Sequence, residues 1–354
     1  MSSISRRNYS SAMSIIANLK HSGVLAKQLQ VWGTVDVSVE VGQENLFMTN
    51  IQFNENSTKC LICGSDSLHF FNATAFDSAS TAPVSIRECK NCYFAWQFPR
   101  GRTSEQSADW YKKAYADHNH ANSDYFDEER KREISQLEVD YIASLPIENR
   151  SLLDIGAGAG IFAALAAENG WNVTAVDPAI SGSRFEDNAA VRAIKGTLDD
   201  IPNGQLFDLI TLWDVIEHVE TPLELIKSTR NYLKKGGWLV IETGNYKSAD
   251  RVMEGKEHWM YQFDHRWYFS PDSMQYLLTE CGFESIKIYD KVLRPGWIGS
   301  VGYPGPSRVH LLKSILRNPL HFPLFLSKHH LLKKAKKWNH GGIGIFTIAA
   351  RKAA

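Results

Sequence analysis

The fold of this chain is decided by residues 151–160, which read Ser-Leu-Leu-Asp-Ile-Gly-Ala-Gly-Ala-Gly. An apolar run ends at Asp154, three glycines follow, and residues 161–167 have the composition of a helix. A strand, a tight glycine turn and a helix N-terminus bring backbone close to a nucleotide-like ligand. A second apolar segment, residues 172–176, ends at Asp177, whose carboxylate can accept hydrogen bonds from both hydroxyls of a ribose.

Strand and helix patterns alternate outward from this turn. A helix is predicted at 221–234, which begins with Thr-Pro and ends before a Gly-Gly pair. Strands are predicted at 151–155, 172–177, 191–195, 207–213, 237–243, 285–290 and 343–350. Such alternation predicts an α/β fold with a doubly wound parallel sheet, in which ligands bind at the carboxyl ends of the strands.

Further motifs indicate which class of nucleotide-like ligand the turn binds. A dinucleotide-binding fingerprint needs glycine at position 161, where this chain has Ile. Residues 207–219 read Phe-Asp-Leu-Ile-Thr-Leu-Trp-Asp-Val-Ile-Glu-His-Val, and residues 233–241 read Leu-Lys-Lys-Gly-Gly-Trp-Leu-Val-Ile. In order and spacing these motifs resemble the class I methyltransferases that use S-adenosylmethionine (SAM), over roughly residues 150–290. The resemblance implies a Rossmann-like sheet, an enzyme, and SAM as its cofactor.

The same resemblance implies a SAM site. The glycine turn surrounds the methionine and ribose, Asp154 supports the turn or the amino group, and Asp177 binds the ribose. The segment after the third strand contacts adenine, and the end of the fourth strand borders the sulfonium and the acceptor. The implied residues are Asp154, Gly156, Gly158, Gly160, Asp177, Leu198, Asp199, Trp213 and Asp214. Helix capping is the alternative for Asp154 and Asp214.

Two histidine segments are candidates for the chemistry. Methyl transfer needs an in-line nucleophile, and a general base where that nucleophile must lose a proton. His218 lies beside the donor, in a Glu-His-Val turn after the fourth strand. Residues 262–270 read Gln-Phe-Asp-His-Arg-Trp-Tyr-Phe-Ser and are similar to the H-E-H-x-x-Y-F-S signature of sugar C-methyltransferases. That similarity implies catalytic roles for Asp264, His265 and Tyr268.

The second segment departs from the signature at two positions. Phe263 replaces the first His, and Asp264 replaces Glu. The motifs therefore predict methyl transfer to carbon or to oxygen without choosing between them. A structural hydrogen bond to the surrounding loop is the alternative for His218 and for His265.

Four cysteines form two Cys-x-x-Cys pairs with 25 residues between them. Two such turns complete a tetrahedral four-thiolate site, which is closed and therefore structural. We predict that Cys60, Cys63, Cys89 and Cys92 bind zinc in a zinc ribbon at 56–100, which is too small to bury a sufficient core alone. Four unrelated core thiols are the alternative, and Cys281 is expected to be such a core thiol. A ribbon ahead of the methyltransferase motifs resembles bacterial methyltransferases of sugars and other small molecules.

Charge is divided unevenly along the 354 residues, although the net charge is zero. Residues 291–354 hold twelve Lys or Arg and no acid, so the rest carries 27 basic and 39 acidic residues. A basic segment predicts an anionic partner, and we expect residues 293–342 to form an insertion that caps a phosphorylated or nucleotide-linked small-molecule acceptor. A solvated face that balances the acidic body is the alternative.

The remaining divisions are a 1–55 N-terminal extension, a 101–147 helical linker or lid, a 148–292 SAM-binding core and a final strand at 343–354. No apolar run is long enough to span a bilayer, and cysteines in metal-binding spacing predict a reducing, cytoplasmic location. Residues 1–35 are basic, Ser-rich and free of acid, so an organellar transit peptide is the alternative.

Two other functions are compatible with these features. One is an RNA methyltransferase that grips its substrate with the ribbon and the basic segment, although the ribbon is not strongly basic and no Asn-Pro-Pro-Tyr-like motif follows the fourth strand. The other is a SAM-binding partner subunit without catalysis, which the intact acidic residues and histidine segments disfavour.

Overall fold

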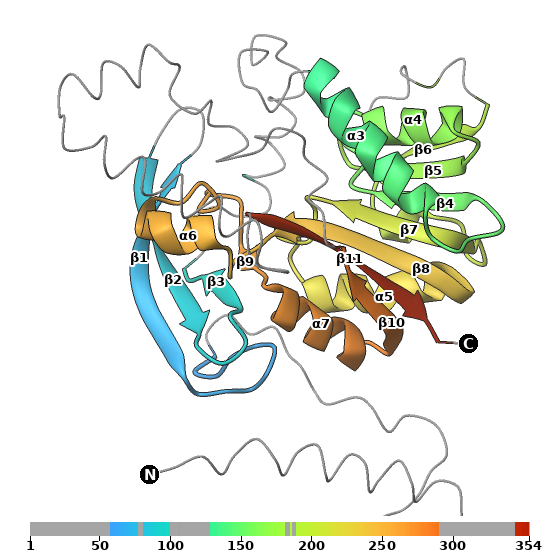
Figure 1. Cartoon of the computed structure of the whole chain (residues 1–354). Coiled ribbons are helices and arrows are strands. Elements are labelled where there is room, and N and C mark those ends of the chain that lie inside the picture. Colours follow the sequence, from blue (N-terminus) through green and yellow to red (C-terminus); the bar gives the residue numbers. More distant parts are fainter. Residues whose placement is uncertain are drawn as a thin grey trace, which may run out of the picture. The chain divides into compact units, whose positions relative to one another are not determined.

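A computed structural model describes residues 57–76, 81–99, 106, 128–180, 185, 189–289 and 344–353 (Figure 1). The N-terminal extension at 1–55, most of the linker before residue 128 and the basic insertion at 293–342 lie outside the described residues. Among the residues described, no helix is long and apolar enough to cross a membrane.

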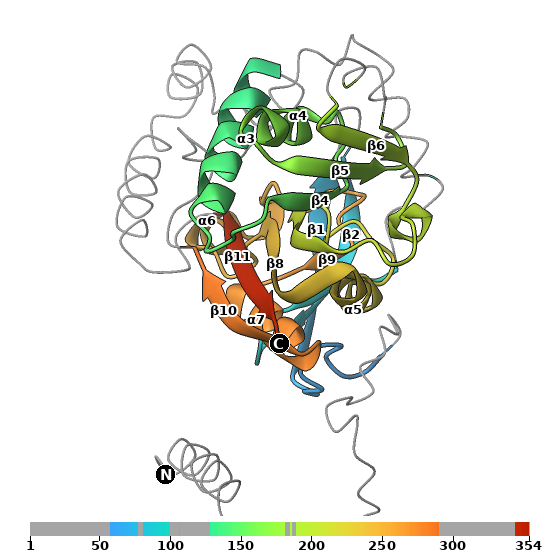
Figure 2. The ribbon, with the colours of Figure 1, turned by 90° about the vertical axis from the view of Figure 1, so that its right-hand side faces the viewer.

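The larger sheet has seven strands. Figure 2 shows β6, β5 and β4 above β8 and β11. The strand order is β10 (Phe283–Ile288), β11 (Ile345–Lys352), β8 (Leu233–Gly244), β7 (Phe207–Trp213), β4 (Ser151–Ile155), β5 (Asn172–Asp177) and β6 (Val191–Lys195). The pairs from β6 to β8 are parallel, so their carboxyl ends share one edge of the sheet.

The expectation of a wholly parallel sheet is wrong at β11, which runs antiparallel to both β8 and β10. Residues 345–350 are buried without interruption. A strand covered on both faces has a continuous apolar sequence in either direction, so its pattern could not reveal its direction. The fold is a Rossmann-like α/β fold with a mixed sheet.

Helices cover both faces of this sheet. On β4, Leu152 packs into one core with α3 and α4, whereas Leu153 packs into the opposite core with α5 and α7. This alternation follows from the two-residue period of a strand. The helices are α3 (Glu128–Ala143), α4 (Ile161–Glu168), α5 (Pro222–Tyr232), α6 (Ala249–Glu254) and α7 (Pro271–Glu280), with short 3-10 turns η4 (Leu198–Asp200) and η5 (Gly255–Glu257).

The smaller sheet joins the cysteine segment to the second half of the chain. Its order is β1 (Leu68–Phe76), β2 (Thr81–Cys89), β3 (Ala95–Gln97) and β9 (Trp267–Tyr268), all antiparallel (Figure 1). Phe94 and Trp96 are fully buried in the same core as one face of the larger sheet. The cysteine segment therefore shares a core with the α/β fold, although the sequence suggested a lobe that only metal would hold together.

Candidate functional site

The glycine turn after β4 adopts a left-handed backbone, which strongly favours glycine. Gly156, Gly158 and Gly160 have φ angles of 73°, 52° and 76°. A Cβ on Gly156 would lie 2.4 Å from Val215 Cγ2, and one on Gly160 would lie 2.2 Å from Phe185 Cζ. The backbone conformation favours glycine at all three positions, and close packing also excludes a side chain at Gly156 and Gly160.

Asp177 holds the turn from the end of β5. Its Oδ2 accepts a hydrogen bond of 3.0 Å from the amide of Gly158, and its Oδ1 accepts one of 2.7 Å from the amide of Ala179. A carboxylate oxygen can accept two hydrogen bonds, so each oxygen retains a lone pair for a ligand hydroxyl. The half-buried carboxylate is suited both to shape the turn and to bind a diol.

Asp154 lies at the centre of the sheet, with 2% of its surface exposed. Its Oδ1 accepts a hydrogen bond of 2.9 Å from Thr211 Oγ1 on β7. Burial, with a smaller contribution from the charge of Asp177, raises the pKa of Asp154 to about 7 against the opposing effect of the Thr211 hydrogen bond. The N-caps of α4 and α5 are Gly160 and Thr221, so neither Asp154 nor Asp214 has the capping role considered as an alternative.

The end of β7 supplies the next part of this edge. Asp214 has a φ of 53°, an uncommon conformation for a residue with a side chain, and its amide donates to Glu242 O on β8. The Trp213 ring packs edge-on against Phe162 of α4 at 5.2 Å between centroids. Trp213 Nε1 is buried and has no hydrogen-bond acceptor among the described residues. Leu198 is buried on η4, and Asp199 beside it is exposed.

The two histidine segments meet next to this edge. The rings of His218 and His265 lie 4.7 Å apart in an edge-on arrangement. His218 Nδ1 lies 3.2 Å from Asp264 O and 3.5 Å from Asp264 Oδ2. His265 Nδ1 lies 2.8 Å from Met260 O. Since a carbonyl oxygen can only accept, each ring carries a proton on Nδ1, so that Nε2 is the acceptor nitrogen of the neutral tautomer.

A family match connects these two halves of the site. Residues 126–288 match the family model described as "Methyltransferase domain". The chain carries a class I SAM-dependent methyltransferase domain. SAM is its cofactor, and the chain is an enzyme. The match begins at residue 126 and so includes α3, which the sequence had assigned to a linker.

Several known proteins are similar to this methyltransferase. A ubiquinone biosynthesis O-methyltransferase of Cereibacter sphaeroides (strain ATCC 17025) is 29% identical over 175 residues, covering 46% of this chain and 71% of the relative. One from Rickettsia canadensis is 27% identical over 151 residues, covering 39% and 64%. A solved SAM-dependent methyltransferase from Archaeoglobus fulgidus is 20% identical and has a TM-score of 0.43, covering 64% of this chain and 98% of that chain.

Charge in the histidine cluster of the methyltransferase is set by burial. Burial, with a smaller contribution from His218, lowers the pKa of His265 to about 4, so this imidazole is neutral at pH 7. Burial raises the pKa of Glu217 to about 7. Glu217 Oε2 has no hydrogen-bond donor among the described residues. Glu217 offers a carboxylate oxygen, and His218 and His265 each offer a ring nitrogen. These three atoms lie within 4.8 Å of one another, an arrangement that can hold a proton or a divalent cation.

Tyr268 is placed differently from the other catalytic candidates. It is 3% exposed, and its hydroxyl accepts a hydrogen bond of 2.8 Å from Gln97 Nε2 on the ribbon. Burial raises the pKa of this phenol, which therefore keeps its proton. The structure brings His218, Asp264 and His265 together but turns the hydroxyl of Tyr268 to the ribbon.

The four cysteines converge as their spacing predicted. Their thiols lie within 4.8 Å of one another, with Cys60 Sγ 3.5 Å from Cys92 Sγ and Cys63 Sγ 3.6 Å from Cys89 Sγ. Zinc bonded to four sulfurs at about 2.3 Å sets them about 3.8 Å apart. The amides of Ile62 and Asn91 donate to the first cysteine of each pair, as thiolate ligands require. This donor set fits zinc, and Cys281 is a separate buried thiol as expected.

Two functional contacts could not be found from sequence. Thr211 reaches Asp154 from a strand 57 positions away, and Gln97 reaches the histidine segment from the ribbon. Thr211 is a polar residue in the apolar fourth strand, and this hydroxyl in a buried position is the one sequence feature that could have pointed to a buried hydrogen-bond partner. Gln97 stands in a short stretch of aromatic and apolar residues and carries no motif.

Proposed function

We propose that this methyltransferase transfers the methyl group of SAM to a hydroxyl oxygen of a small molecule, a sugar or a nucleotide-linked sugar being the favoured class. The observation that supports this most is the His218–Asp264 pair beside the end of β7. His218 presents Nε2 while Asp264 restrains its other nitrogen, which is how a general base is oriented. His218 is the more exposed of the two histidines, with 20% of its side chain accessible.

Each side of the site has its own task in this proposal. The glycine turn, Asp154 and Asp177 hold the methionine and ribose of SAM, and Leu198 with Asp199 lies along the adenine. Trp213 and Asp214 border the sulfonium. His218 removes the proton of the acceptor hydroxyl as oxygen attacks the methyl carbon, and S-adenosylhomocysteine leaves. A positioned base contributes about 10²- to 10⁴-fold to such a step.

His265 has a supporting role in this proposal. It is buried, neutral at pH 7 and packed edge-on against His218. The proposed base therefore has an uncharged ring beside it, which does not disfavour protonation of His218 by charge repulsion. Tyr268 supports the loop through Gln97, and its phenol does not enter the proton transfer. Zinc bound by Cys60, Cys63, Cys89 and Cys92 would take no direct part in the chemistry, because four thiolates leave no open coordination position.

The acceptor class is supported from two directions. The ribbon and the 262–270 segment resemble those of sugar methyltransferases, and the relatives of 27–29% identity are named O-methyltransferases. A basic insertion at 293–342 suits a phosphorylated or nucleotide-linked acceptor. We place the reaction in the cytoplasm, where reduced cysteines keep a metal site intact.

Transfer of tritium from methyl-labelled SAM tests this function. The panel contains nucleotide-linked sugars, free sugars, catechol-type phenols and a folded RNA, each assayed at low and high salt. We expect label in a small-molecule hydroxyl with weak salt dependence. Label in RNA that falls steeply with salt would establish the RNA methyltransferase instead. Tight SAM binding with no labelled product across the panel, together with a copurifying catalytic partner, would establish a binding subunit.

A further inference from the structure

One buried residue of the ribbon clamps the segment that carries Asp264 and His265. Gln97 is 2% exposed, and its Nε2 donates to Gln262 O at 2.6 Å and to the Tyr268 hydroxyl at 2.8 Å. The backbone N–H of Gln97 donates to Arg266 O at 3.0 Å. These three bonds bracket residues 262–268 on both sides of the two candidate residues. The clamp therefore fixes the ends of a short loop whose middle faces His218.

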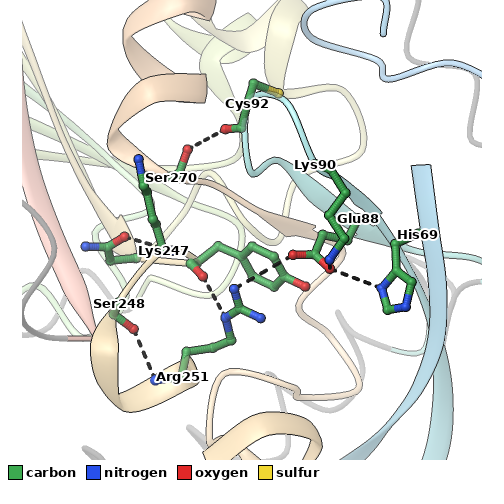
Figure 3. A network of polar contacts seen from close by, with 10 residues as sticks. His69, Glu88, Lys90, Cys92, Lys247, Ser248, Arg251 and Ser270 are labelled. Atoms are coloured by element: carbon green, nitrogen blue, oxygen red, sulfur yellow. Dashed lines mark hydrogen bonds and ion pairs between the residues drawn. The ribbon is translucent and has the colours of Figure 1, made fainter. Parts of the chain in front are cut away.

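The cysteine site is bonded to the same loop. Ser270 Oγ donates to the carbonyl of Cys92 at 2.7 Å, a bond between a metal-ligand residue and the N-cap of α7 (Figure 3). Phe94, two residues after Cys92, stacks on Trp267 at 6.2 Å and lies 5.2 Å from Phe269. The four-cysteine turn, β3 and the loop thus form one continuous buried unit.

A second contact ties the ribbon to the segment after β8. Figure 3 shows Glu88, on β2 next to Cys89, with its carboxylate directed to Lys90, His69 and Arg251. Arg251 Nε donates to Tyr246 O at 2.7 Å, and its guanidinium lies 4.1 Å from the centre of the Tyr246 ring. Glu88 is 4% exposed, so this carboxylate is a buried partner of the arginine.

The SAM side is held by other bonds. The amides of Gly156 and Gly158 donate to Val176 O and to Asp177 on β5, and Asp154 accepts from Thr211 on β7. All of these partners belong to the larger sheet. A loss of order in the ribbon would therefore reach the histidine loop before it reached the glycine turn.

We infer that the four-cysteine ribbon is a working part of the acceptor site, in which Gln97 is the positioning residue that presents Asp264 and His265 to His218. Metal in the ribbon then controls the acceptor side and leaves SAM binding intact. The inference rests on the proposed function in one respect, namely that residues 262–268 face the acceptor. The inference gives the metal a role in ordering residues 262–268, in addition to stabilising the fold.

Hydrogen exchange on the whole chain tests the coupling without an acceptor. Zinc-loaded protein is compared with protein whose zinc has been chelated under reducing conditions, and with Gln97→Leu and Gln97→Glu. Peptides covering 258–270 report the loop, and calorimetry reports SAM affinity. We expect about tenfold faster exchange in the loop for Gln97→Leu, since two buried side-chain hydrogen bonds are lost, and an affinity for SAM within about twofold.

NMR spectra that resolve the ring nitrogens of the histidines distinguish a positioning role of Gln97 from a general effect on stability. In the zinc-loaded protein His218 and His265 are expected to carry the proton on Nδ1, and Gln97→Leu or zinc removal should mix the two tautomers. Added zinc should restore both signals in wild type, which keeps the test valid if Gln97→Leu folds poorly. Gln205→Leu is the matched control, because Gln205 donates its amide to Thr174 within the larger sheet.

Two results would overturn the inference. Loop exchange and histidine spectra that stay unchanged on zinc removal would show that the loop is independent of the ribbon. Equal loss of SAM binding and loop order would show that the ribbon stabilises the whole fold without a specific link. Because neither readout uses an acceptor, a failed acceptor panel would contradict the proposed function alone.

Discussion

The SAM side and the acceptor side of this site are built in different ways. The SAM side consists of backbone turns at the ends of neighbouring strands, and its longest side-chain bond spans 57 positions. The acceptor side depends on side chains of two sheets, with bonds from Gln97 that span 165 and 171 positions. The first can be recognised as a motif, whereas the second exists only after the chain has folded.

This difference has a consequence for function. A site made of glycine conformation and strand ends is expected to tolerate variation in the smaller sheet, because all of its bonds lie within the larger sheet. A site made of long-range side-chain bonds changes whenever either sheet changes. We therefore expect the two sides to be separable by mutation, and the following experiments test that separation.

The largest effect is expected for the proposed base. His218→Ala should lower turnover of the acceptor found in the panel by about 10²- to 10⁴-fold, because a positioned base is lost. SAM affinity, measured by calorimetry, should stay within about twofold. His69→Ala is the control, since this histidine lies on the ribbon with half of its side chain exposed. A similar loss of SAM affinity in His218→Ala would show that the two sides are not separable.

The next effect concerns pH and the buried carboxyl of the SAM side. The pKa of Asp154 is raised from an ordinary 3.8 to about 7, so the folded protein binds this proton more tightly than the unfolded chain. The stability that this provides is fully present below about pH 4 and is lost as the pH rises through 7. Asp154→Asn has no carboxyl to titrate and so does not lose this stability. In SAM-free protein, the free energy of unfolding of the variant relative to that of wild type should therefore increase with pH, by about 4 kcal/mol above pH 7.

Urea unfolding between pH 4.5 and 8 measures this difference, and a parallel pair of curves would contradict it. Asp208→Asn is a control of opposite sign. Burial raises the pKa of Asp208, but Lys234 and Ser151 outweigh it, so the pKa of this carboxyl is lowered. Its stabilising contribution is present above its ordinary pKa and lost as the pH falls, so Asp208→Asn should be least stable, relative to wild type, near neutral pH.

A smaller effect is expected at the glycine turn. Gly160→Ala combines a φ of 76° with a Cβ 2.2 Å from Phe185, and should cost about 1–3 kcal/mol in free energy of unfolding. SAM affinity should fall with it, because the turn must shift. Gly204→Ala is the matched control: its φ is 82°, but no atom lies within 4 Å of the added Cβ. Equal SAM affinity in the two variants would mean that the turn does not contact SAM.

The smallest effect is expected at the end of β5. Asp177→Asn keeps the size of the side chain but removes its charge, and should weaken SAM binding about tenfold, or about 1.4 kcal/mol. Asp140→Asn, on the exposed side of α3, should leave the affinity unchanged. If Asp177→Asn bound SAM as tightly as wild type, the ribose would have to lie elsewhere.

Much of the fold could be predicted from particular residues. The strands at 151–155, 172–177, 191–195 and 207–213 agree with the structure residue by residue, because each is a short segment rich in apolar residues and bounded by turn or polar residues. The predicted helix at 221–234 ends two residues early, and β8 takes over from Leu233. The direction of β11 could not be predicted, because a strand buried on both faces looks the same in either direction.

By itself the sequence determined the glycine turn, the methyltransferase motifs and the four-cysteine spacing. Each of these depends on residues close together in the chain, and on conformations or ligands that few residue types allow. Only the tertiary structure decided that Tyr268 faces Gln97, that His218 meets His265, and that the ribbon forms one sheet with the acceptor loop. Those contacts join segments far apart in sequence through packing and single hydrogen bonds, which leave no local pattern in the chain.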